Sequence, residues 1–196
     1  MNLLRYWANL VFVCGFVCYV IIRHVFEKKA KIKKSVSSRF GIQEKLLIGT
    51  LSLGIFLLPV LYLFTSVLGF ADYRANNYVQ WGGVVVMLTS LWLFWRSHVD
   101  LGSNFSMTLE IKEDHELVTN GVYRFVRHPM YASIWLWAAA QALMLQNWVA
   151  GLAALITFAP MYFLRVRREE AMMSDTFQEK YRDYKSHTGR VFPRLL

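Results

Sequence analysis

The motif Arg127-His128-Pro129-Met130-Tyr131 stands just before an apolar run and contains residue types that could bind a small molecule. The residue before a proline is disfavoured in helical conformation, whereas proline itself suits the first turn of a helix. We therefore expect His128 near an N-cap and Pro129 in the first helical turn. The free backbone amides and the positive end of the helix dipole would then form a seat for a carboxylate.

An alternative interpretation gives these residues a purely structural role. Arg124 and Arg127 would extend to lipid headgroups, and His128 would only cap the helix. This interpretation is sufficient for the two arginines taken alone. The whole set from Gly121 to Tyr131 favours a small-molecule site.

A second candidate pair, Arg165 and Glu169, follows another apolar run, in the segment Arg165-Val166-Arg167-Arg168-Glu169-Glu170. Beyond it, apolar and aromatic residues recur at spacings of four, four and three: Met173, Phe177, Tyr181 and Tyr184. This spacing is typical of one face of an amphipathic helix, and its continuation backwards by fours reaches Glu169 and Arg165. We expect the pair to face protein rather than water, and an ionisable pair buried at a membrane edge is a candidate functional site.

Both motifs adjoin apolar runs that we interpret as membrane spans. The composition is 56% hydrophobic and 18% charged, whereas about 25% of an ordinary soluble domain is charged. A helix needs about 20 residues, with roughly 17 as a lower limit, to cross the hydrocarbon layer. We predict an all-α polytopic membrane protein with five transmembrane helices, which are Leu3–Ile22, Leu46–Phe70, Tyr78–Trp95, Tyr131–Leu145 and Trp148–Leu164. The last two runs are short, and Gln146-Asn147 is typical of the tip of a helical hairpin.

Positive charge is concentrated at one set of helix ends. Of the 22 Lys and Arg residues, 20 fall in three segments, which are the loop after the first span, the loop 96–130 and the C-terminal tail. With five spans these segments share one side. The positive-inside rule makes that side cytoplasmic and places the N-terminus outside the cell membrane. We expect this face to attract anionic lipid headgroups, and no nucleic-acid partner is predicted because no recognition motif accompanies the charge.

The chain is interpreted as one integrated domain with two regions. Residues 1–95 form a three-helix membrane anchor region, and residues 96–196 form a candidate catalytic region with a polar loop, a two-helix hairpin and a C-terminal amphipathic helix. The loop is long for a connector, and the apolar residues in its middle are expected to pack against another part of the protein. Pro59 is expected to kink the second span. The first span is interpreted as an anchor rather than a signal peptide, because its basic cluster follows it.

Several familiar signatures are absent from the sequence. It contains no GxGxxG after a strand, no P-loop, no HExxH and no GxSxG. The histidines lack metal-ligand spacing, so no metal site is predicted. Cys14 and Cys18 are interpreted as small side chains at a helix–helix contact rather than as a metal or redox pair.

Four blocks in the second half resemble the isoprenylcysteine carboxyl methyltransferase family. They are Leu117-Val118-Thr119-x-Gly121-Val122-Tyr123, Arg127-His128-Pro129-x-Tyr131, Arg165-x-x-x-Glu169-Glu170 and Phe177-x-x-x-Tyr181-x-x-Tyr184. The resemblance runs from about residue 100 to residue 193, and the short chain is similar to prokaryotic members. Two positions depart from the family pattern, since Gln178 and Ser133 stand where glycine is common.

The resemblance implies an integral membrane methyltransferase with S-adenosyl-L-methionine as cofactor and S-adenosyl-L-homocysteine as product. The cofactor-binding residues would be Leu117, Val118, Gly121, Tyr123, His128, Pro129, Met130, Tyr131 and Glu169. The catalytic residues would be Arg165, Glu169 and Glu170, and Arg165 would also bind the substrate.

The chemistry of methyl transfer suits these residue types. Displacement at a sulfonium is an in-line reaction, so proximity and orientation supply most of the catalysis. A carboxylate acceptor needs no general base but needs a cation to place it, which Arg165 offers through bidentate bonds. Tyr123 and Tyr131 could stack on adenine or face the sulfonium. The expected acceptor is an isoprenylcysteine-like lipid that reaches a monomeric enzyme from the bilayer.

Three other functions are compatible with the sequence. Methylation of a phospholipid amine would need Glu169 or Glu170 as a base. A membrane reductase would consume a reduced nicotinamide cofactor. A lipid-binding protein without enzymatic activity would bind its ligand without turnover, and Arg165→Ala would then change affinity alone.

Overall fold

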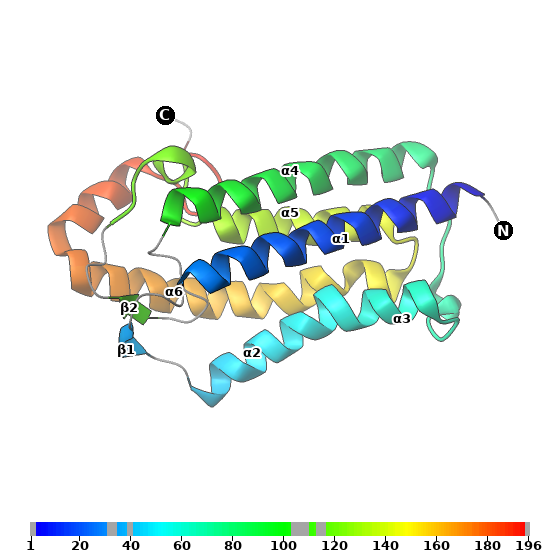
Figure 1. The fold of residues 1–196 in the computed structure, drawn as a ribbon, viewed down its shortest axis with the longest axis horizontal. Coiled ribbons are helices and arrows are strands. Elements are labelled where there is room, and N and C mark those ends of the chain that lie inside the picture. The colour runs from blue at the N-terminus through cyan, green and yellow to red at the C-terminus, as the bar shows by residue number, and fades with distance from the viewer. Residues whose placement is uncertain (1–2, 31–34, 39–40, 103–109, 113–116, 195–196) are drawn as a thin grey trace.

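The structure, a computed structural model, describes residues 3–30, 35–38, 41–102, 110–112 and 117–194 as a bundle of helices (Figure 1). The α-helices are α1 (Leu3–Ala30), α2 (Ile42–Ser52), α3 (Leu58–Phe64), α4 (Asn77–Leu101), α5 (Pro129–Met144) and α6 (Trp148–His187). Shorter elements are a π-helix at Leu53–Leu57 and 3-10 helices at Gly69–Ala71 and Gly121–Arg124. Two strands, β1 (Ser35–Ser38) and β2 (Glu110–Lys112), pair antiparallel and were not foreseen. The helical fold class is confirmed. Part of the basic first loop and of the loop 96–130 lies outside the described residues.

Four stretches have the length and apolar composition to cross a membrane. They are Trp7–Lys28, Ile42–Phe64, Asn77–Leu101 and the long α6, Trp148–His187. The remaining predicted span corresponds to α5, whose 16 residues measure about 24 Å at 1.5 Å per residue. That length falls short of the ~30 Å hydrocarbon layer. Four of the five predicted spans thus correspond to helices with the length and apolar composition of membrane spans, and α5 does not.

The second span is interrupted near Pro59, as the sequence predicts. The π-helix Leu53–Leu57 separates α2 from α3, and Pro59 lies in the first turn of α3. A π-bulge and a proline are both recognised causes of helix distortion. A Cβ at Gly54 would lie 2.7 Å from the Ala153 carbonyl oxygen, so glycine allows this segment to approach α6 closely. The predicted end of the span at Phe70 was wrong, because the chain leaves helical geometry at Thr65.

The turn between α5 and α6 is built on Asn147, which confirms the predicted hairpin tip. Its side-chain oxygen accepts hydrogen bonds from the backbone amides of Val149 and Ala150, at 3.1 and 2.9 Å, and so caps α6. Its side-chain amide donates to the Leu68 carbonyl at 2.6 Å and to the Asp72 carboxylate at 2.8 Å. The tip is thereby attached to the loop between α3 and α4.

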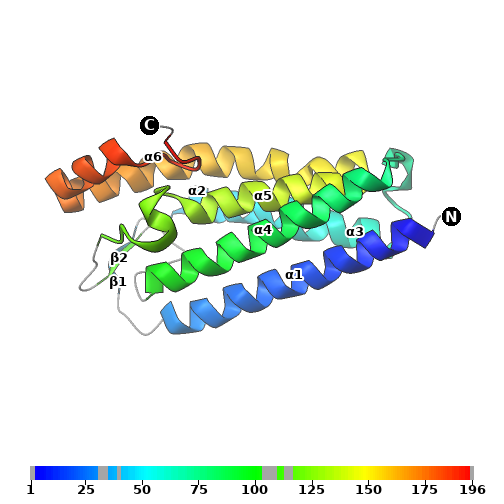
Figure 2. The same cartoon turned by 90° about the horizontal axis from the view of Figure 1, so that it is seen from above.

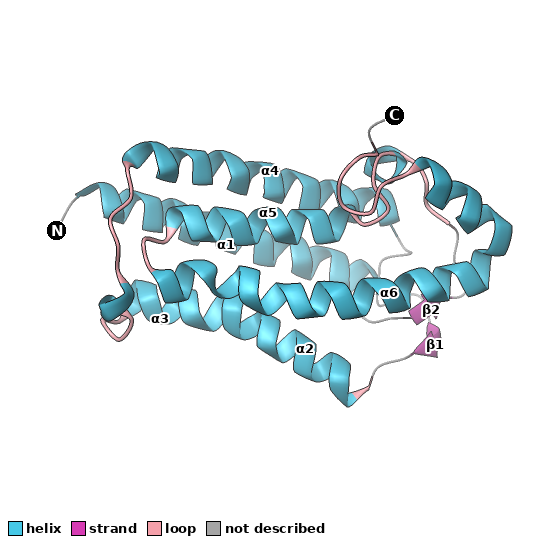
Figure 3. Cartoon of the chain, turned by 180° about the vertical axis from the view of Figure 1, so that it is seen from behind, coloured by secondary structure: helices cyan, strands magenta, loops and turns pink. Residues whose placement is uncertain are grey.

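Helix α5 is the central helix of the bundle and lies between α4 and α6 (Figures 2 and 3). Trp137, Ala138, Ala140 and Met144 on α5 are completely buried. Close packing on all sides fixes the position of this helix, and with it the first turn at Pro129. By contrast, the interpretation of Cys14 and Cys18 as residues of a helix contact was wrong, because both side chains are exposed on the outside of α1.

The C-terminal amphipathic helix predicted from the sequence is continuous with α6 but folds back after a sharp kink at Gln178 (Figure 1). Gln178 has φ 46° and ψ −117°, a conformation that side-chain-bearing residues rarely adopt. The kink returns residues 179–187 towards the loop before α5. The stripe of Tyr181 and Tyr184 is buried as a result.

Gln178→Gly is expected to stabilise the protein. Glycine adopts positive φ without a steric penalty, and strain of this kind costs about 1–3 kcal/mol. We expect the melting temperature in detergent to rise by several degrees, at about 2–4 °C per kcal/mol. Asp175→Gly is the matched control, because Asp175 is an exposed α6 residue before the kink where glycine should lower stability. A lower melting temperature for Gln178→Gly would contradict the assigned backbone geometry.

Candidate functional site

The candidate site lies at the end of the bundle where α4 ends and α5 begins, and where α6 passes its kink (Figure 1). Gly121 starts the 3-10 helix of the adjoining loop with φ 58°. A Cβ there would lie 2.0 Å from the Asp100 carboxylate, which accepts a hydrogen bond from the Val122 amide at 2.8 Å. Arg96 pairs with the same carboxylate at 2.8 Å. Gly121, a predicted cofactor-binding residue, is thus required for the loop to sit on the end of α4.

Tyr123 anchors the loop to α4 and to the returning part of α6. Its backbone carbonyl accepts a hydrogen bond from the Tyr184 hydroxyl at 2.7 Å, and its own hydroxyl donates to the Ser97 carbonyl at 3.5 Å. Burial, and next the negative charge of Glu169, raise the pKa of the Tyr123 phenol well above its usual value. Tyr123 therefore stays a neutral hydrogen-bond donor at any physiological pH.

Glu170 is the centre of a buried ionic cluster. Glu170 is 5% exposed, and its carboxylate accepts hydrogen bonds from Arg127 at 3.1 Å and from Arg190 at 2.9 Å. The His128 Nε2 atom lies 3.3 Å from the same carboxylate. The hydrogen bond with Glu170 also raises the pKa of the Arg190 guanidinium. Glu170 therefore joins the start of α5 to the C-terminal tail.

Backbone hydrogen bonds reinforce this junction. The amide of Arg127 donates to the Gly189 carbonyl at 2.8 Å, and the amide of His128 donates to the Arg190 carbonyl at 2.9 Å. The Arg127 guanidinium also donates to the carbonyls of Thr188 and Lys185. His128 is the N-cap residue of α5, as predicted, but its side chain makes no capping bond and turns to Glu170 instead.

Glu169 faces the start of α5 from the neighbouring position on α6. Its carboxylate accepts a 2.6 Å hydrogen bond from the Tyr131 hydroxyl, and its Oε1 lies 3.8 Å from His128 Nδ1. The rings of His128 and Tyr131 stack with centroids 5.5 Å apart. The Glu169 side chain is 26% exposed, so the prediction that it faces protein holds only in part. Glu170, not Glu169, is the fully buried acid of the pair.

Arg165 is buried, as predicted, and pairs with a residue that the sequence did not single out. It is 9% exposed, and its Nη1 lies 3.2 Å from Oε1 of Glu44, which is 3% exposed. One turn further along α6, the exposed Arg168 donates to the Gln43 side chain at 2.6 Å. An acidic residue at the edge of an apolar span was an available signal for Glu44. No local pattern connected it to Arg165, which lies far away in the sequence.

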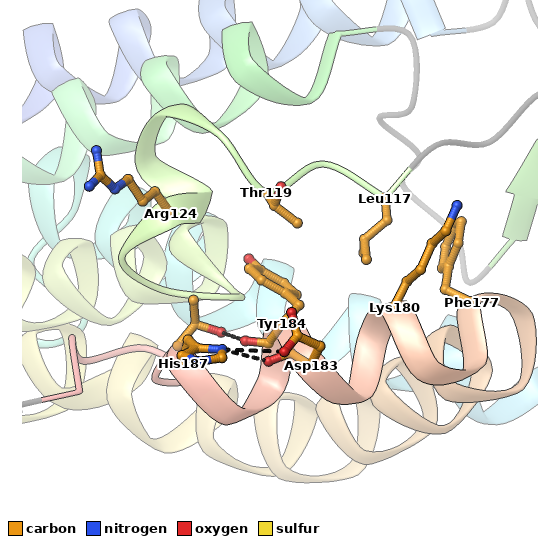
Figure 4. A pocket seen from close by; sticks show the side chains of 9 residues that line it. Leu117, Thr119, Arg124, Phe177, Lys180, Asp183, Tyr184 and His187 are labelled. Carbon is orange, nitrogen blue, oxygen red and sulfur yellow. Dashed lines mark hydrogen bonds and ion pairs between the residues drawn. The ribbon is translucent and has the colours of Figure 1, made fainter.

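A pocket of about 690 Å³ opens between the loop and the returning part of α6 (Figure 4). Its lining residues are Leu117, Thr119, Arg124, Phe177, Lys180, Asp183, Tyr184, His187 and Thr188. Figure 4 shows Leu117 and Thr119 on the loop side and Phe177 on the helix side. Thr188 also belongs to the wall between the pocket and the Glu170 cluster, because its carbonyl accepts a hydrogen bond from Arg127.

The predicted site residues thus fall into three neighbouring groups. His128, Tyr131, Glu169 and Glu170 meet directly. Among the cofactor-binding residues, Leu117 borders the pocket, Val118 is half-buried beside it, and Pro129 and Met130 form the first turn of α5. Arg165 lies on the Glu44 side of α6. The sequence missed Glu44, Asp100 and Arg190, whose roles depend on contacts between distant elements.

Comparison with known proteins gives these motifs a family context. The model of the isoprenylcysteine carboxyl methyltransferase (ICMT) family matches residues 82–175. A probable protein-S-isoprenylcysteine O-methyltransferase of Oryza sativa subsp. indica is 28% identical over 132 residues, which cover 65% of this chain and 69% of the relative. The protein-S-isoprenylcysteine O-methyltransferase of Schizosaccharomyces pombe is 34% identical over 99 residues, covering 50% of this chain and 42% of that protein.

A solved structure of the eukaryotic intramembrane Ras methyltransferase ICMT has a similar fold. The TM-score is 0.52 at 23% identity, and the match covers 81% of this chain and 54% of the solved chain, so this chain spans about half the length of that protein. The apolar helices and the shared fold together identify an integral membrane protein. Through residues 82–175, which hold the start of α5 and the Glu169-Glu170 pair, the chain is similar to the isoprenylcysteine carboxyl methyltransferase family.

Proposed function

We propose that this protein is a membrane methyltransferase that transfers a methyl group from S-adenosyl-L-methionine to the carboxylate of an isoprenylcysteine-like lipid. The observation that carries the proposal is the meeting of His128 and Tyr131 with Glu169 and Glu170. These two blocks are 38 to 42 residues apart in the sequence and form one polar site inside the segment that matches the family. The names of the rice and fission yeast relatives support the same activity.

The pocket and its surroundings fit the proposed cofactor. A volume of about 690 Å³ lies in the range of small-molecule sites, about 300–1,000 Å³. Leu117, Phe177 and Tyr184 provide apolar and aromatic walls, beside the polar groups of Asp183 and His187. Leu117, Val118, Gly121, Tyr123, His128, Pro129, Met130, Tyr131 and Glu169 are the proposed cofactor-binding residues, directly or through the loop that they shape.

One buried donor next to this site also supports a ligand. The Tyr181 hydroxyl is buried and makes no hydrogen bond with the residues that the structure describes. It lies within electrostatic reach of Glu169 and Glu170. Buried polar atoms nearly always have a partner, so an unpaired hydroxyl here suits a site that receives a polar ligand.

In the proposed mechanism the protein positions the reactants. When bound, the cofactor supplies an electrophilic methyl group on a sulfonium. Glu169, held by the Tyr131 hydroxyl, offers a carboxylate to a cationic ligand, and Arg165 offers a guanidinium to the acceptor carboxylate. Because the acceptor is already an anion, orientation and exclusion of water suffice and no side chain has to remove a proton. Glu170 keeps the start of α5 and the C-terminal tail in place around the site.

We propose the following membrane arrangement. The chain crosses the bilayer five times as a monomer, and α5 makes the short fifth crossing because neighbouring helices enclose it. The N-terminus is outside, and the basic ends of the helices, with the cofactor loop, face the cytoplasm and anionic headgroups. The returning part of α6 is the amphipathic helix at this interface. Residues 1–95 serve as the anchor region and residues 96–196 as the catalytic region of one domain.

Two measurements on the purified protein in detergent test the proposed function. Isothermal titration is expected to show binding of S-adenosyl-L-homocysteine. Radiolabelled methyl transfer is expected to an S-farnesylcysteine analogue and not to its methyl ester, which lacks the free carboxylate. Absence of cofactor binding would reject the proposal, and labelling of amine lipids in place of the carboxylate would reject the proposed acceptor.

A further inference from the structure

The buried ion pair of Glu44 and Arg165 connects the membrane anchor region to the proposed substrate-binding cation. Glu44 lies in the first turn of α2, is 3% exposed and approaches Arg165 to 3.2 Å. It lies outside residues 82–175, the segment that matches the family. The contact therefore adds a charged residue to the site from a region in which the sequence indicated no chemistry.

The Glu44 carboxylate has few partners for a buried anion. Neither of its oxygens makes a hydrogen bond with the described residues, and the ion pair with Arg165 is the compensation that the structure shows for its charge. A buried carboxylate that serves only to hold helices together is normally satisfied by several donors. The oxygens of Glu44 could instead accept further hydrogen bonds, which the described side chains do not donate.

Arg165 also belongs to the site described above. It interacts with the Tyr131 hydroxyl, which donates to Glu169. Glu44, Arg165, Tyr131 and Glu169 thus form one polar row from α2 through α6 to the start of α5. An acceptor carboxylate bound by Arg165 would enter this row beside Glu44.

The proposed reaction changes the charge that Arg165 must face. A carboxylate oxygen of the acceptor attacks the methyl carbon, a C–O bond forms, and the C–S bond breaks with its electron pair left on sulfur. The acceptor loses its negative charge, the sulfonium loses its positive charge, and no proton moves. After transfer, the buried guanidinium faces a neutral ester. A buried cation is stabilised by a nearby carboxylate, so loss of the acceptor's negative charge favours renewed pairing of Arg165 with Glu44.

We propose that Glu44 is an internal carboxylate that occupies Arg165 whenever no acceptor carboxylate is bound. It gives way to the acceptor on binding and returns to Arg165 after the ester has formed, so it keeps Arg165 oriented between turnovers. Glu44 is accordingly a positioning residue that competes with the acid and not with the ester. This inference rests on the proposed function, because it takes Arg165 as the site of the acceptor carboxylate.

The test uses two ligands, an S-farnesylcysteine analogue with a free carboxylate (the acid) and its methyl ester (the ester). Their binding to the wild-type protein and to Glu44→Gln is compared in detergent. Glutamine keeps the shape of the side chain and removes the competing charge. We expect the acid to bind about tenfold more tightly to Glu44→Gln, since an internal competitor reduces the apparent affinity to the fraction of Arg165 that it leaves free. The affinity for the ester should stay unchanged.

Gln43→Ala is the matched control. It removes the neighbouring contact of α2 with Arg168 on α6 and leaves the Glu44–Arg165 pair in place. We expect unchanged affinities for both acid and ester in this variant. Equal weakening of acid and ester in Glu44→Gln would show a merely structural role and overturn the inference, and so would an unchanged affinity for the acid.

Two further measurements keep the result interpretable. Binding of S-adenosyl-L-homocysteine reports whether Glu44→Gln is folded, and Glu44→Asp replaces it if that binding is lost. The shorter aspartate should hold Arg165 less well and tighten acid binding by a smaller factor, whereas no change would again oppose the inference. Because these binding measurements need no turnover, an inactive wild-type protein would reject the proposed function alone. If the wild-type protein transfers methyl groups but the Glu44 variants bind the acid with wild-type affinity, the inference is rejected and the proposed function stands.

Discussion

Arg165→Ala is expected to lower kcat/KM for methyl transfer to a carboxylate acceptor by about 100-fold or more, while binding of S-adenosyl-L-homocysteine is retained. Loss of one partner from a buried charge pair costs about 2–5 kcal/mol, and each 1.36 kcal/mol corresponds to a factor of ten. Arg165 is 9% exposed, so water cannot replace the guanidinium effectively. The measurement is a radiolabel assay over a range of acceptor concentrations, with cofactor binding measured by titration.

Arg168→Ala provides the control for this prediction. Arg168 lies one turn further along α6, is exposed and contacts α2 through Gln43, so its loss changes charge and helix contact without touching the buried pair. We expect near wild-type activity. Since Arg165→Ala also leaves Glu44 buried without its counter-ion, the double variant Arg165→Gln with Glu44→Gln should recover stability but not activity. Full activity in either Arg165 variant would show that another group binds the acceptor.

Glu170→Ala is expected to lower the melting temperature in detergent by an amount on the order of 10 °C. The carboxylate is 5% exposed and compensates the guanidinium groups of Arg127 and Arg190. Removing one partner from such a cluster costs about 3–5 kcal/mol, and each kcal/mol changes the melting temperature of a chain of this size by about 2–4 °C. We also expect weaker cofactor binding, because the C-terminal tail would separate from the start of α5.

Limited proteolysis gives a local readout of the same change. Trypsin should cleave Glu170→Ala faster than the wild type after Lys185 and Arg190, which both contact the Glu170 carboxylate. Glu179→Gln is the matched control, since Glu179 is an exposed α6 acid whose ion pair with Arg182 lies in solvent. It should melt and be cleaved like the wild type. A stable, protease-resistant Glu170→Ala protein would mean that the backbone bonds of Arg127 and His128 suffice to hold the tail.

The sequence by itself determined the features that depend on neighbouring residues. His128 before Pro129 predicted the start of α5, and Gln146-Asn147 predicted the turn into α6, because proline geometry and side-chain capping act within a single turn. The spacing of four placed Arg165 on a buried face for the same reason. The family resemblance could also be found in the sequence, since each of its motifs is a short run of neighbouring residues.

The α6 stripe shows where local spacing ceases to be sufficient. The helical spacing of Met173, Phe177, Tyr181 and Tyr184 predicted one continuous face, but the kink at Gln178 divides it. Met172 and Glu170 are buried shortly before the kink, whereas Met173 and Phe177 are only partly buried, and Tyr181 and Tyr184 are buried after it. Gln178 departs from the glycine that is common at this position in the family, and its positive φ in the structure explains why glycine suits the position.

The partners of the charged residues were decided by the tertiary structure alone. Glu44 reaches Arg165 because α2 packs on α6, and Arg190 reaches Glu170 because the chain folds back after the kink. Such pairings depend on how whole helices pack, which no spacing along one helix specifies. Buried ions require a counter-ion wherever the fold can supply one. The sequence therefore identified Arg165, Glu169 and Glu170 as residues that matter, and the packing of distant helices determined which charge each of them faces.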